Sequence, residues 1–299
     1  MMDKIYIAGC GGMLGEAFHS VLGVNYSLRC TDIDLNESWL SYLDFRDLNK
    51  YRLDVKSFSP NYLIHLGAHT DLEYCEQNIS DAYSTNAVSV DNAVLIANEL
   101  DIPLIYISTA GVFDGKQDEY DDWDTPNPLG HYARSKYIGE LAVSSRVRNF
   151  LVCRAGWMMG GGPAKDKKFI QKLIAQIKDG SKELFIVDDK FGTPTYTHDF
   201  AMNVELLIKE SAWGLYNMVC AGTTSRLEVA SELLNILNLS DSIKITPVSS
   251  DYFKNIYFAP RPLSERLLNT KLNLREMDKM RNWRTALREY LTDYYGDYL

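Results

Sequence analysis

The sequence predicts an α/β protein built on a doubly wound parallel sheet, and three observations carry this prediction. Short apolar runs alternate with amphipathic segments through the N-terminal half of the 299-residue chain, the pattern of strands that alternate with helices. Small residues follow some of the apolar runs, as they do where a parallel sheet leaves room for a ligand. A glycine-rich turn joins the first run to the first amphipathic segment. Together these features are typical of a Rossmann-type sheet, to which we add a smaller α/β lobe in the C-terminal part.

The glycine-rich turn follows a short apolar run near the start of the chain. Gly9, Gly12 and Gly15 recur at every third position. Gly9 would permit the tight turn, Gly12 would let the backbone approach a pyrophosphate, and Gly15 would let the helix pack on the strand. The free N–H groups at the helix start, around Met13 and Leu14, would then hold phosphate. Any tight strand–helix turn can use glycine, so the position between strand and helix is what favours dinucleotide binding.

An acidic residue ends the second predicted strand, which covers 26–31. Asp32 lies roughly 20 residues past the glycines, where a carboxylate can accept hydrogen bonds from the adenosine ribose. No Lys or Arg follows it closely, so a 2′-phosphate would meet repulsion. We therefore expect NADH to be preferred over NADPH. The alternative is a carboxylate that only caps a turn at the end of the strand.

Two later segments belong to the same predicted edge of the sheet. Residues 43–47 are expected to form a short strand and turn, in which Asp44 and Phe45 would flank the adenine. The strand that begins at Asn61 runs into small residues, which leave space at its carboxyl end. These cofactor-lining residues are Leu66, Gly67 and Ala68. His65 is expected to be a buried histidine with hydrogen-bond partners rather than a catalyst.

A tyrosine and a lysine occupy one face of a later predicted helix. Tyr132 and Lys136 are spaced i, i+4, which brings their side chains together. A phenol that gives up a proton near neutral pH needs a lowered pKa, and a neighbouring ammonium favours the phenolate. The pair follows both the glycine turn and a strand that ends in Ser108-Thr109. This order makes the pair a candidate for catalysis rather than a chance spacing.

Composition excludes several other classes of function. The formal net charge of −9 argues against nucleic acid or an anionic membrane as the main partner. No apolar run reaches the ~20 residues of a membrane helix. The five cysteines are scattered without metal-ligand spacing, and we expect buried free thiols in a cytoplasmic protein. The acidic run 118–124 is expected to be a solvated loop, and no metal site is predicted.

These motifs together resemble the extended short-chain dehydrogenase/reductase family, and in particular its dTDP-4-dehydrorhamnose reductase-like branch. The N-terminal half supplies the GxxGxxG turn, the Ser108-Thr109 strand end and the Tyr132–Lys136 pair. The C-terminal half supplies further segments of the branch, namely Arg154-Ala155-Gly156-Trp157, Gly192-Thr193-Pro194-Thr195 and Arg261-Pro262. The resemblance covers nearly the whole chain.

The resemblance implies an enzyme that uses NAD(P)H to reduce the 4-keto group of a nucleotide-diphosphate deoxysugar. It implies that Tyr132 donates the proton, that Lys136 lowers its pKa and binds the nicotinamide ribose, and that Thr109 polarises the carbonyl. The remaining residues carried over are Asn86 near the nicotinamide, Thr70 and Trp157 at the sugar, and Arg261 near the diphosphate. A homodimer is left open.

The chain also departs from this branch. Where the reductases read Ser-Thr-Asp-Tyr-Val-Phe, it has Ala110 and Gly111 in place of the Asp and the Tyr, which puts the identity of the hexose in doubt. A sugar-nucleotide epimerase or dehydratase of the same superfamily is one alternative, although Ala110 and Gly111 offer a dehydratase neither acid nor base. A non-catalytic, cofactor-binding regulatory subunit is another.

The expected division of the chain has two parts. Residues 1–155, together with about 187–222, would form the dinucleotide-binding domain. Residues from about 156 to 186 and from 223 to 299 would form the substrate-binding lobe.

Overall fold

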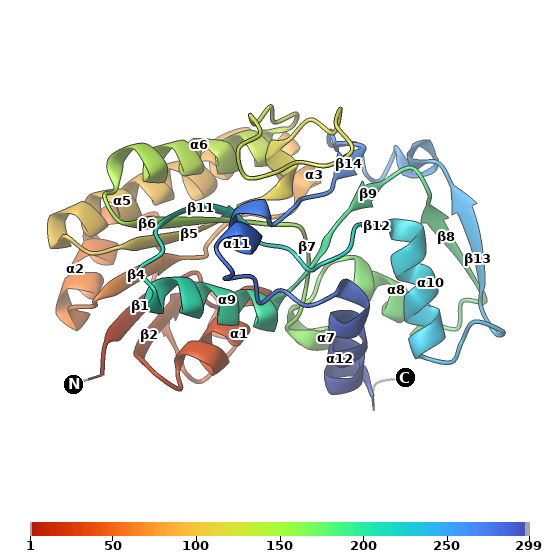
Figure 1. Ribbon diagram of the computed structural model, residues 1–299, viewed down its shortest axis with the longest axis horizontal. Helices are drawn as coiled ribbons and strands as arrows, with labels where there is room; N and C mark the ends of the chain where they lie inside the picture. The colour runs from red at the N-terminus through yellow and green to blue at the C-terminus, as the bar shows by residue number, and fades with distance from the viewer. Residues whose placement is uncertain (1, 297–299) are drawn as a thin grey trace.

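A computed structural model describes residues 2–296, and within them a seven-stranded parallel sheet forms the centre (Figure 1). Its strand order is β11-β6-β5-β4-β1-β2-β3. The strands are β1 (Lys4–Ala8), β2 (Ser27–Asp32), β3 (Leu40–Tyr42), β4 (Tyr62–His65), β5 (Leu104–Thr109), β6 (Phe150–Ala155) and β11 (Gly214–Asn217). The order reverses between β1 and β4, and open α/β sheets bind ligands outside the carboxyl ends of the strands at such a point. The predicted doubly wound Rossmann-type sheet is confirmed.

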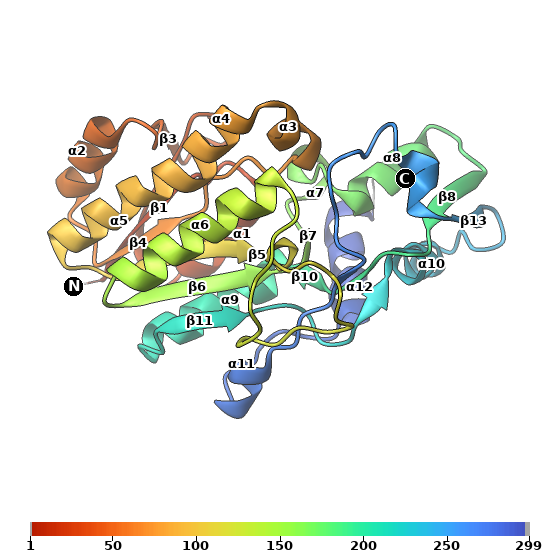
Figure 2. The same cartoon turned by 90° about the horizontal axis from the view of Figure 1, so that it is seen from above.

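Helices cover both faces of this sheet (Figures 1 and 2). One face carries α2 (Leu48–Phe58), α5 (Ser89–Leu100) and α6 (His131–Arg146), and the other carries α1 (Met13–Leu22) and α9 (Thr197–Lys209). The first strand shows why two layers form, because its side chains alternate between two apolar clusters. Ile5 and Ile7 belong to the cluster on the α1 side, and Tyr6 and Ala8 to the cluster on the α2 side. A strand that is buried on both faces reads as a continuous apolar run.

Smaller sheets lie beside the main one, at the right of Figure 1. They pair β7 (Trp157–Met159) with β10 (Pro194–Tyr196), β8 (Glu183–Val187) with β13 (Lys244–Val248), and β9 (Phe191–Gly192) with β12 (Thr224–Ser225) and β14 (Ser264–Glu265). The helices of this region are α7 (Gly162–Lys165), α8 (Phe169–Lys178), α10 (Arg226–Ile236) and α12 (Trp283–Tyr295). Short helices α3 (Leu72–Gln77), α4 (Ile79–Tyr83) and α11 (Thr270–Leu274) complete the chain, with 3-10 turns at Ala110–Val112 and Ser250–Phe253.

One predicted element differs from the structure. The strand expected within 43–47 lies earlier, at Leu40–Tyr42, because Asp47 instead caps α2 by accepting from the backbone N–H of Lys50 at 3.1 Å. The structure also has a π-helical segment, Ser84–Val88, between α4 and α5. Such segments are rare and occur often at functional sites. Apolar spacing cannot reveal one extra residue in a turn.

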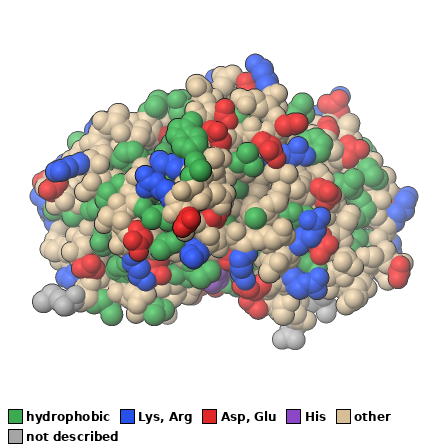
Figure 3. Space-filling view, in the orientation of Figure 1, with side chains coloured by type: hydrophobic (Ala, Val, Ile, Leu, Met, Phe, Trp, Pro, Cys, Tyr) green, Lys and Arg blue, Asp and Glu red, His purple; other side chains and the backbone are tan. Residues whose placement is uncertain are grey.

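Two other expectations, on the cysteines and on His65, are confirmed. The five cysteines are buried and free. His65 is buried, its Nε2 lies 3.1 Å from Ser89 Oγ, and burial lowers its pKa to about 3. No helix within residues 2–296 is long and apolar enough to cross a membrane. On the face shown in Figure 3, acidic and basic side chains are interspersed.

Candidate functional site

The glycine turn lies at the carboxyl end of β1, and each glycine has its own steric reason. Gly9 has a φ of +79°, and a Cβ there would lie 2.3 Å from the Gly67 backbone. A Cβ on Gly15 would lie 1.9 Å from the Cys10 carbonyl oxygen, so Gly15 lets α1 pack on the turn. A Cβ on Gly12 would meet nothing within 4 Å. The turn therefore needs Gly9 and Gly15 for the fold, and it leaves open space at Gly12.

This open space faces the start of α1, which carries no side-chain cap. The first N–H groups of an uncapped helix are available to an anion, and the helix dipole favours negative charge there. The room at Gly12 and the free helix start together fit the pyrophosphate of a dinucleotide.

Asp32 holds the glycine turn from the neighbouring strand. Its Oδ2 accepts a hydrogen bond from the Gly11 N–H at 2.8 Å, and its Oδ1 accepts from the Asp34 N–H at 3.0 Å. The side chain is only partly buried. Asp32 is thus both the turn carboxylate of the alternative interpretation and a charge beside the turn. The hydrogen bond to the adenosine ribose stays a prediction.

A basic residue that the sequence analysis missed lies near the same turn. Gly161 packs against Met13, since a Cβ on Gly161 would lie 3.1 Å from the Met13 Cα. The helix α7 that follows brings the Lys165 ammonium within 2.8 Å of Glu37 and places it over the Trp39 ring at 5.3 Å. Glu37 thus neutralises this ammonium. Sequence reasoning searched for a basic residue only directly after Asp32, whereas Lys165 comes from a segment more than a hundred positions away.

The segment after β4 forms the next wall of the site. A Cβ on Gly67 would lie 2.1 Å from the Phe45 ring, so Phe45 and Gly67 are in contact as the shared edge predicts. The Asp44 carboxylate, in contrast, is bound by the Arg46 guanidinium, with Nη2 to Oδ2 at 2.8 Å. Leu66 and Gly67 both donate their N–H groups to the Ala8 carbonyl.

Asn86 ties this wall to helix α6. It is fully buried within the π-helical segment. Its Oδ1 accepts from the His69 N–H at 2.8 Å, and its Nδ2 donates to the His69 carbonyl at 3.0 Å and to Ser135 Oγ at 3.1 Å. Ser135 in turn donates to the Tyr132 carbonyl at 2.8 Å. Asn86 therefore fixes the loop after β4 relative to the turn of α6 that carries Tyr132.

Helix α6 is held against β5 and β6 by close packing and a buried ion pair. A Cβ on Gly139 would lie 2.5 Å from the Tyr106 hydroxyl oxygen, so glycine permits the close approach. The Glu140 carboxylate accepts two hydrogen bonds of 2.9 Å from Arg154, and both side chains are 3% exposed. A bidentate pair of this kind fixes geometry. Glu140 lies one helical turn after Lys136, so the pair also holds the face of α6 that bears Lys136 against β5 and β6.

Burial sets the protonation of the Tyr132–Lys136 pair. Burial raises the pKa of Tyr132 to about 12, against the lowering effect of a hydrogen bond with Thr109. Burial lowers the pKa of Lys136 to about 7, partly offset by the Glu140 carboxylate, and the ammonium lies 4.2 Å from the centroid of the Tyr106 ring. The expected lowering of the tyrosine pKa is therefore not what this structure has. The phenol is protonated at neutral pH, the form that can donate a proton.

A carboxylate that the sequence analysis did not single out lies beside this pair. The point where a Gly111 side chain would begin is 3.5 Å from Thr109 Oγ1 and 3.6 Å from Glu265 Oε1. Glu265 Oε2 accepts a hydrogen bond of 2.8 Å from the Trp157 indole. The charge of Glu265 also raises the pKa of Tyr132, after burial and Cys75. Ala110 and Gly111 themselves offer neither acid nor base, as the sequence indicates, but β14 brings a carboxylate beside them.

Trp157 is covered on its other side by a second missed residue. The Arg226 guanidinium lies 3.7 Å from the centroid of the Trp157 ring and 4.7 Å from that of Phe169. These residues border a small cavity whose further lining is apolar, with Met158, Met159, Ile170, Pro194 and Val229. Arg226 begins α10, where Ser225 forms a capping box with Glu228. The stacking of Arg226 on Trp157 was not expected from the sequence.

The remaining predicted substrate residues have protein partners. Thr70 is exposed, and its hydroxyl accepts a hydrogen bond of 2.9 Å from the Lys168 ammonium. Arg261 forms a bidentate pair with Glu73, with Nη1–Oε1 at 2.7 Å and Nη2–Oε2 at 2.8 Å. A diphosphate would have to share or displace that carboxylate.

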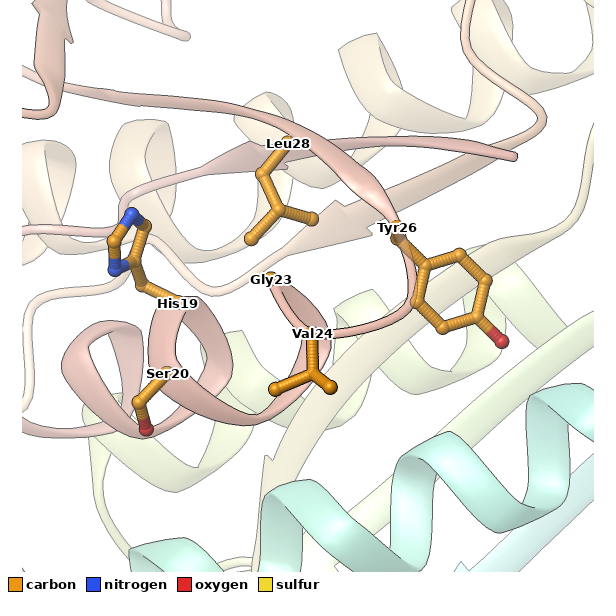
Figure 4. A pocket seen from close by; sticks show the side chains of 6 residues that line it. All are labelled: His19, Ser20, Gly23, Val24, Tyr26 and Leu28. Carbon is orange, nitrogen blue, oxygen red and sulfur yellow. The ribbon is translucent and has the colours of Figure 1, made fainter. Parts of the chain in front are cut away.

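A shallow surface pocket lies elsewhere, between the end of α1 and the start of β2 (Figure 4). It is lined by His19, Ser20, Gly23, Val24, Tyr26 and Leu28. This is the amino end of β2, opposite the edge where the glycine turn lies, and among the described residues no Asp, Glu, Lys or Arg side chain lines the pocket. No group of three or more His, Cys, Asp or Glu side chains that could hold a metal ion occurs in the part of the chain that the structure describes.

Comparison with known families matches residues 2–295 to the RmlD substrate-binding domain. The chain belongs to this family. Relatives include a spore coat polysaccharide biosynthesis protein, SpsK, of Bacillus subtilis, 27% identical over 98% of both chains. Another is a dTDP-4-dehydrorhamnose reductase of Mycobacterium tuberculosis, 31% identical over 75% of this chain and 74% of that one.

Solved structures of the family agree over the whole fold. A dTDP-4-dehydrorhamnose reductase of Bacillus anthracis in complex with NADP has a TM-score of 0.89 and 27% identity, and the match covers 98% of this chain and 100% of that one. The enzyme of the same name from Yersinia enterocolitica has a TM-score of 0.87 and 30% identity over 98% and 99% of the two chains. The resemblance that the motifs predicted is confirmed.

Proposed function

We propose that this protein is a nicotinamide-dependent oxidoreductase that reduces the 4-keto group of a nucleotide-activated deoxysugar. The observation that carries the proposal is the convergence of Thr109, Tyr132 and Lys136 at the carboxyl edge of the sheet, next to a glycine turn with room for a pyrophosphate. Relatives named as reductases of dTDP-linked keto sugars support the substrate class.

The proposed chemistry divides between the cofactor and the chain. The reduced nicotinamide, when bound, supplies the hydride. Tyr132 donates a proton to the carbonyl oxygen, and Thr109 holds that oxygen by hydrogen bonding. Lys136 stabilises the negative charge that remains on the phenol after transfer, and it binds the ribose. Asn86 acts only through the loop and helix that it joins.

We propose the same cofactor-binding and substrate-binding residues that the sequence predicts. The cofactor would lie along the glycine turn, Asp32, the 43–47 turn and the end of β4. Asp32 would accept from the adenosine ribose and favour NADH, since its carboxylate repels a 2′-phosphate. Thr70, Trp157 and Arg261 would contact the sugar nucleotide.

The two-part division of the chain remains a proposal of the same kind. Strand β11 supports it because it returns to the central sheet beside β6, whereas β8 and β13 pair only with each other among the described residues. The segment 187–222 would thus belong with the dinucleotide-binding part, although β8 and β10 lie at its margins.

The test is a survey of cofactor oxidation. The protein would be mixed with dTDP-4-keto-6-deoxy sugars and either NADH or NADPH, and loss of the reduced nicotinamide followed by absorbance. We expect sugar-dependent turnover, faster with NADH at equal concentration. Tight cofactor binding without turnover of any 4-keto sugar would contradict the reductase and favour an epimerase or a regulatory subunit.

A further inference from the structure

Glu265 places an acceptor-only group at the point where the carbonyl would react. Its carboxylate has one committed oxygen, Oε2, which accepts from the Trp157 indole. Among residues 2–296, no donor hydrogen-bonds to the other oxygen, Oε1. That oxygen lies 3.6 Å from the point where a Gly111 Cβ would be, and Thr109 Oγ1 lies 3.5 Å from the same point. An ionised carboxylate accepts hydrogen bonds and donates none. A ligand group beside Oε1 therefore binds best if it donates a hydrogen bond.

Gly111 makes this arrangement possible. It is buried in the 3-10 turn after β5, and its N–H is held by Thr109 Oγ1 at 3.1 Å. Any side chain at this position would begin within 4 Å of both Thr109 and Glu265 and would fill the space between them. With glycine there, the Thr109 hydroxyl and the Glu265 carboxylate face the same ligand atom or two neighbouring ones.

Position and orientation of the carboxylate are set by its neighbours. Strand β14 pairs in parallel with β9, which places Glu265 opposite Gly192. A Cβ on Gly192 would lie 2.4 Å from the Trp157 ring, so the indole sits directly on this small sheet. The Arg226 guanidinium also packs on the indole, 3.7 Å from the ring centroid. The carboxylate is therefore fixed by the indole N–H, and the indole by its packing against Gly192 and Arg226.

We propose that Glu265 accepts a hydrogen bond from the sugar hydroxyl that neighbours the reacting carbonyl, and that this contact selects the substrate. The inference rests on the proposed function for the substrate class. In a 4-keto-6-deoxyhexose the carbonyl carbon has two ring neighbours, and only carbon 3 carries a hydroxyl. Thr109 meets the carbonyl oxygen, so the carboxylate beside it meets the 3-hydroxyl. Glu265 is then the specificity-determining residue of the sugar site.

The test compares two substrates with two variants. The substrates are a dTDP-4-keto-6-deoxyhexose and its 3-deoxy counterpart. Glu265→Gln keeps the size of the side chain and an oxygen that accepts from Trp157, but it loses the charge. Glu210→Gln, an exposed residue at the end of α9, is the matched control.

A hydrogen bond to a charged group contributes enough to change binding by about 10- to 100-fold. We expect the parent protein to favour the 3-hydroxy sugar by this factor in kcat/KM. Glu265→Gln should lose that preference because turnover of the 3-hydroxy sugar falls while that of the 3-deoxy sugar changes little. Glu210→Gln should behave as the parent. An equal fall for both sugars would overturn the proposal, since Glu265 would then act only by holding Trp157.

Two further measurements separate this inference from the proposed function. Calorimetric binding of both sugar nucleotides to the protein with oxidised cofactor tests the contact without turnover. Suppose that calorimetry shows a preference for the 3-hydroxy sugar, that Glu265→Gln removes this preference, and that the protein oxidises no reduced cofactor. This result would support the contact with Glu265 and contradict the proposed reductase activity.

Incubation of the 3-hydroxy sugar in deuterated water without reduced cofactor tests whether Glu265 acts as a base instead. Glu265-dependent deuterium on a ring carbon would overturn the proposal, since Glu265 would then be a base toward carbon, as in an epimerase.

Discussion

The end of the site proposed for the cofactor and the end proposed for the sugar, called the cofactor end and the sugar end below, are built in different ways. At the cofactor end, backbone atoms would form most of the binding surface, because the glycines at 9, 12 and 15 and an uncapped helix start lie within one short segment. At the sugar end, side chains from three distant segments meet, namely Trp157 from β7, Arg226 from α10 and Glu265 from β14. One continuous sequence motif can therefore define a cofactor site, whereas the proposed substrate site depends on how distant segments pack together.

The largest expected effect lies where the two ends meet. Tyr132→Phe removes the proton donor and keeps the ring, so we expect kcat to fall by about 10³-fold. Cofactor binding, measured by fluorescence titration, should stay within about twofold of the parent. Retention of turnover would mean that another group donates the proton, and retention of a cellular function without turnover would favour the regulatory alternative.

Two glycines of one motif should respond in opposite ways. Gly15→Ala would force a Cβ against the Cys10 carbonyl, and we expect the free energy of unfolding to fall by about 3 kcal/mol. Gly12→Ala meets no protein atom, so stability in urea should change by less than about 0.5 kcal/mol. NADH binding should nevertheless weaken by about tenfold, because the methyl group enters the space assigned to the pyrophosphate. Similar losses of stability in both variants would contradict the separate purposes given to these glycines.

A smaller effect should distinguish the two nicotinamide cofactors. Asp32→Asn keeps an acceptor for the Gly11 N–H and loses the negative charge, so the glycine turn should survive. We expect the ratio of kcat/KM for NADH to that for NADPH to fall by about tenfold, which corresponds to about 1.4 kcal/mol. Steady-state rates with both cofactors provide the measurement. An unchanged ratio would leave Asp32 as a turn carboxylate only and direct attention to Lys165 and Glu37.

The smallest effect concerns pH and the buried lysine. Burial lowers the pKa of Lys136 to about 7 from 10.5, so between these values the unfolded chain binds a proton that the folded protein does not. The free energy of unfolding should therefore rise with pH through this window. The comparison is with Lys136→Met, which lacks the titrating group, and the difference should approach about 1 kcal/mol per pH unit. Parallel pH profiles from urea unfolding of the two proteins would show that Lys136 is not desolvated.

The cofactor end was largely predictable because its signals are local. Each signal depends only on one element and the segment next to it in the sequence. These signals are the spacing of the glycines, the carboxylate at the end of β2 and the Tyr132–Lys136 spacing. Steric demands on Gly9 and Gly15 agree with the purposes assigned from sequence. The direction of the Tyr132 pKa was not predictable in this way, because it depends on how deeply α6 is packed.

The sugar end escaped prediction for a physical reason. Glu265 lies more than a hundred positions from Thr109, and no periodicity or spacing connects them. Only the pairing of β14 with β9 brings Glu265 next to Trp157. The stacking of Arg226 on Trp157 escaped prediction as well, because no local signal indicates which ring a side chain at a helix start will cover. Arg261 belongs to the Arg261-Pro262 motif on which the resemblance rests, and the structure gives it a partner, Glu73, that this motif does not contain.

The central claim is that a hydride reaches carbon 4 of a nucleotide-linked keto sugar at this site. The most direct measurement uses NADH that carries deuterium at the transferred position of the nicotinamide, with a dTDP-4-keto-6-deoxy sugar as substrate and nuclear magnetic resonance of the isolated product. The account predicts one deuterium on carbon 4 of the product sugar and loss of this label with Tyr132→Phe. A product that forms with deuterium elsewhere, or with none while the label stays on the cofactor, would contradict it.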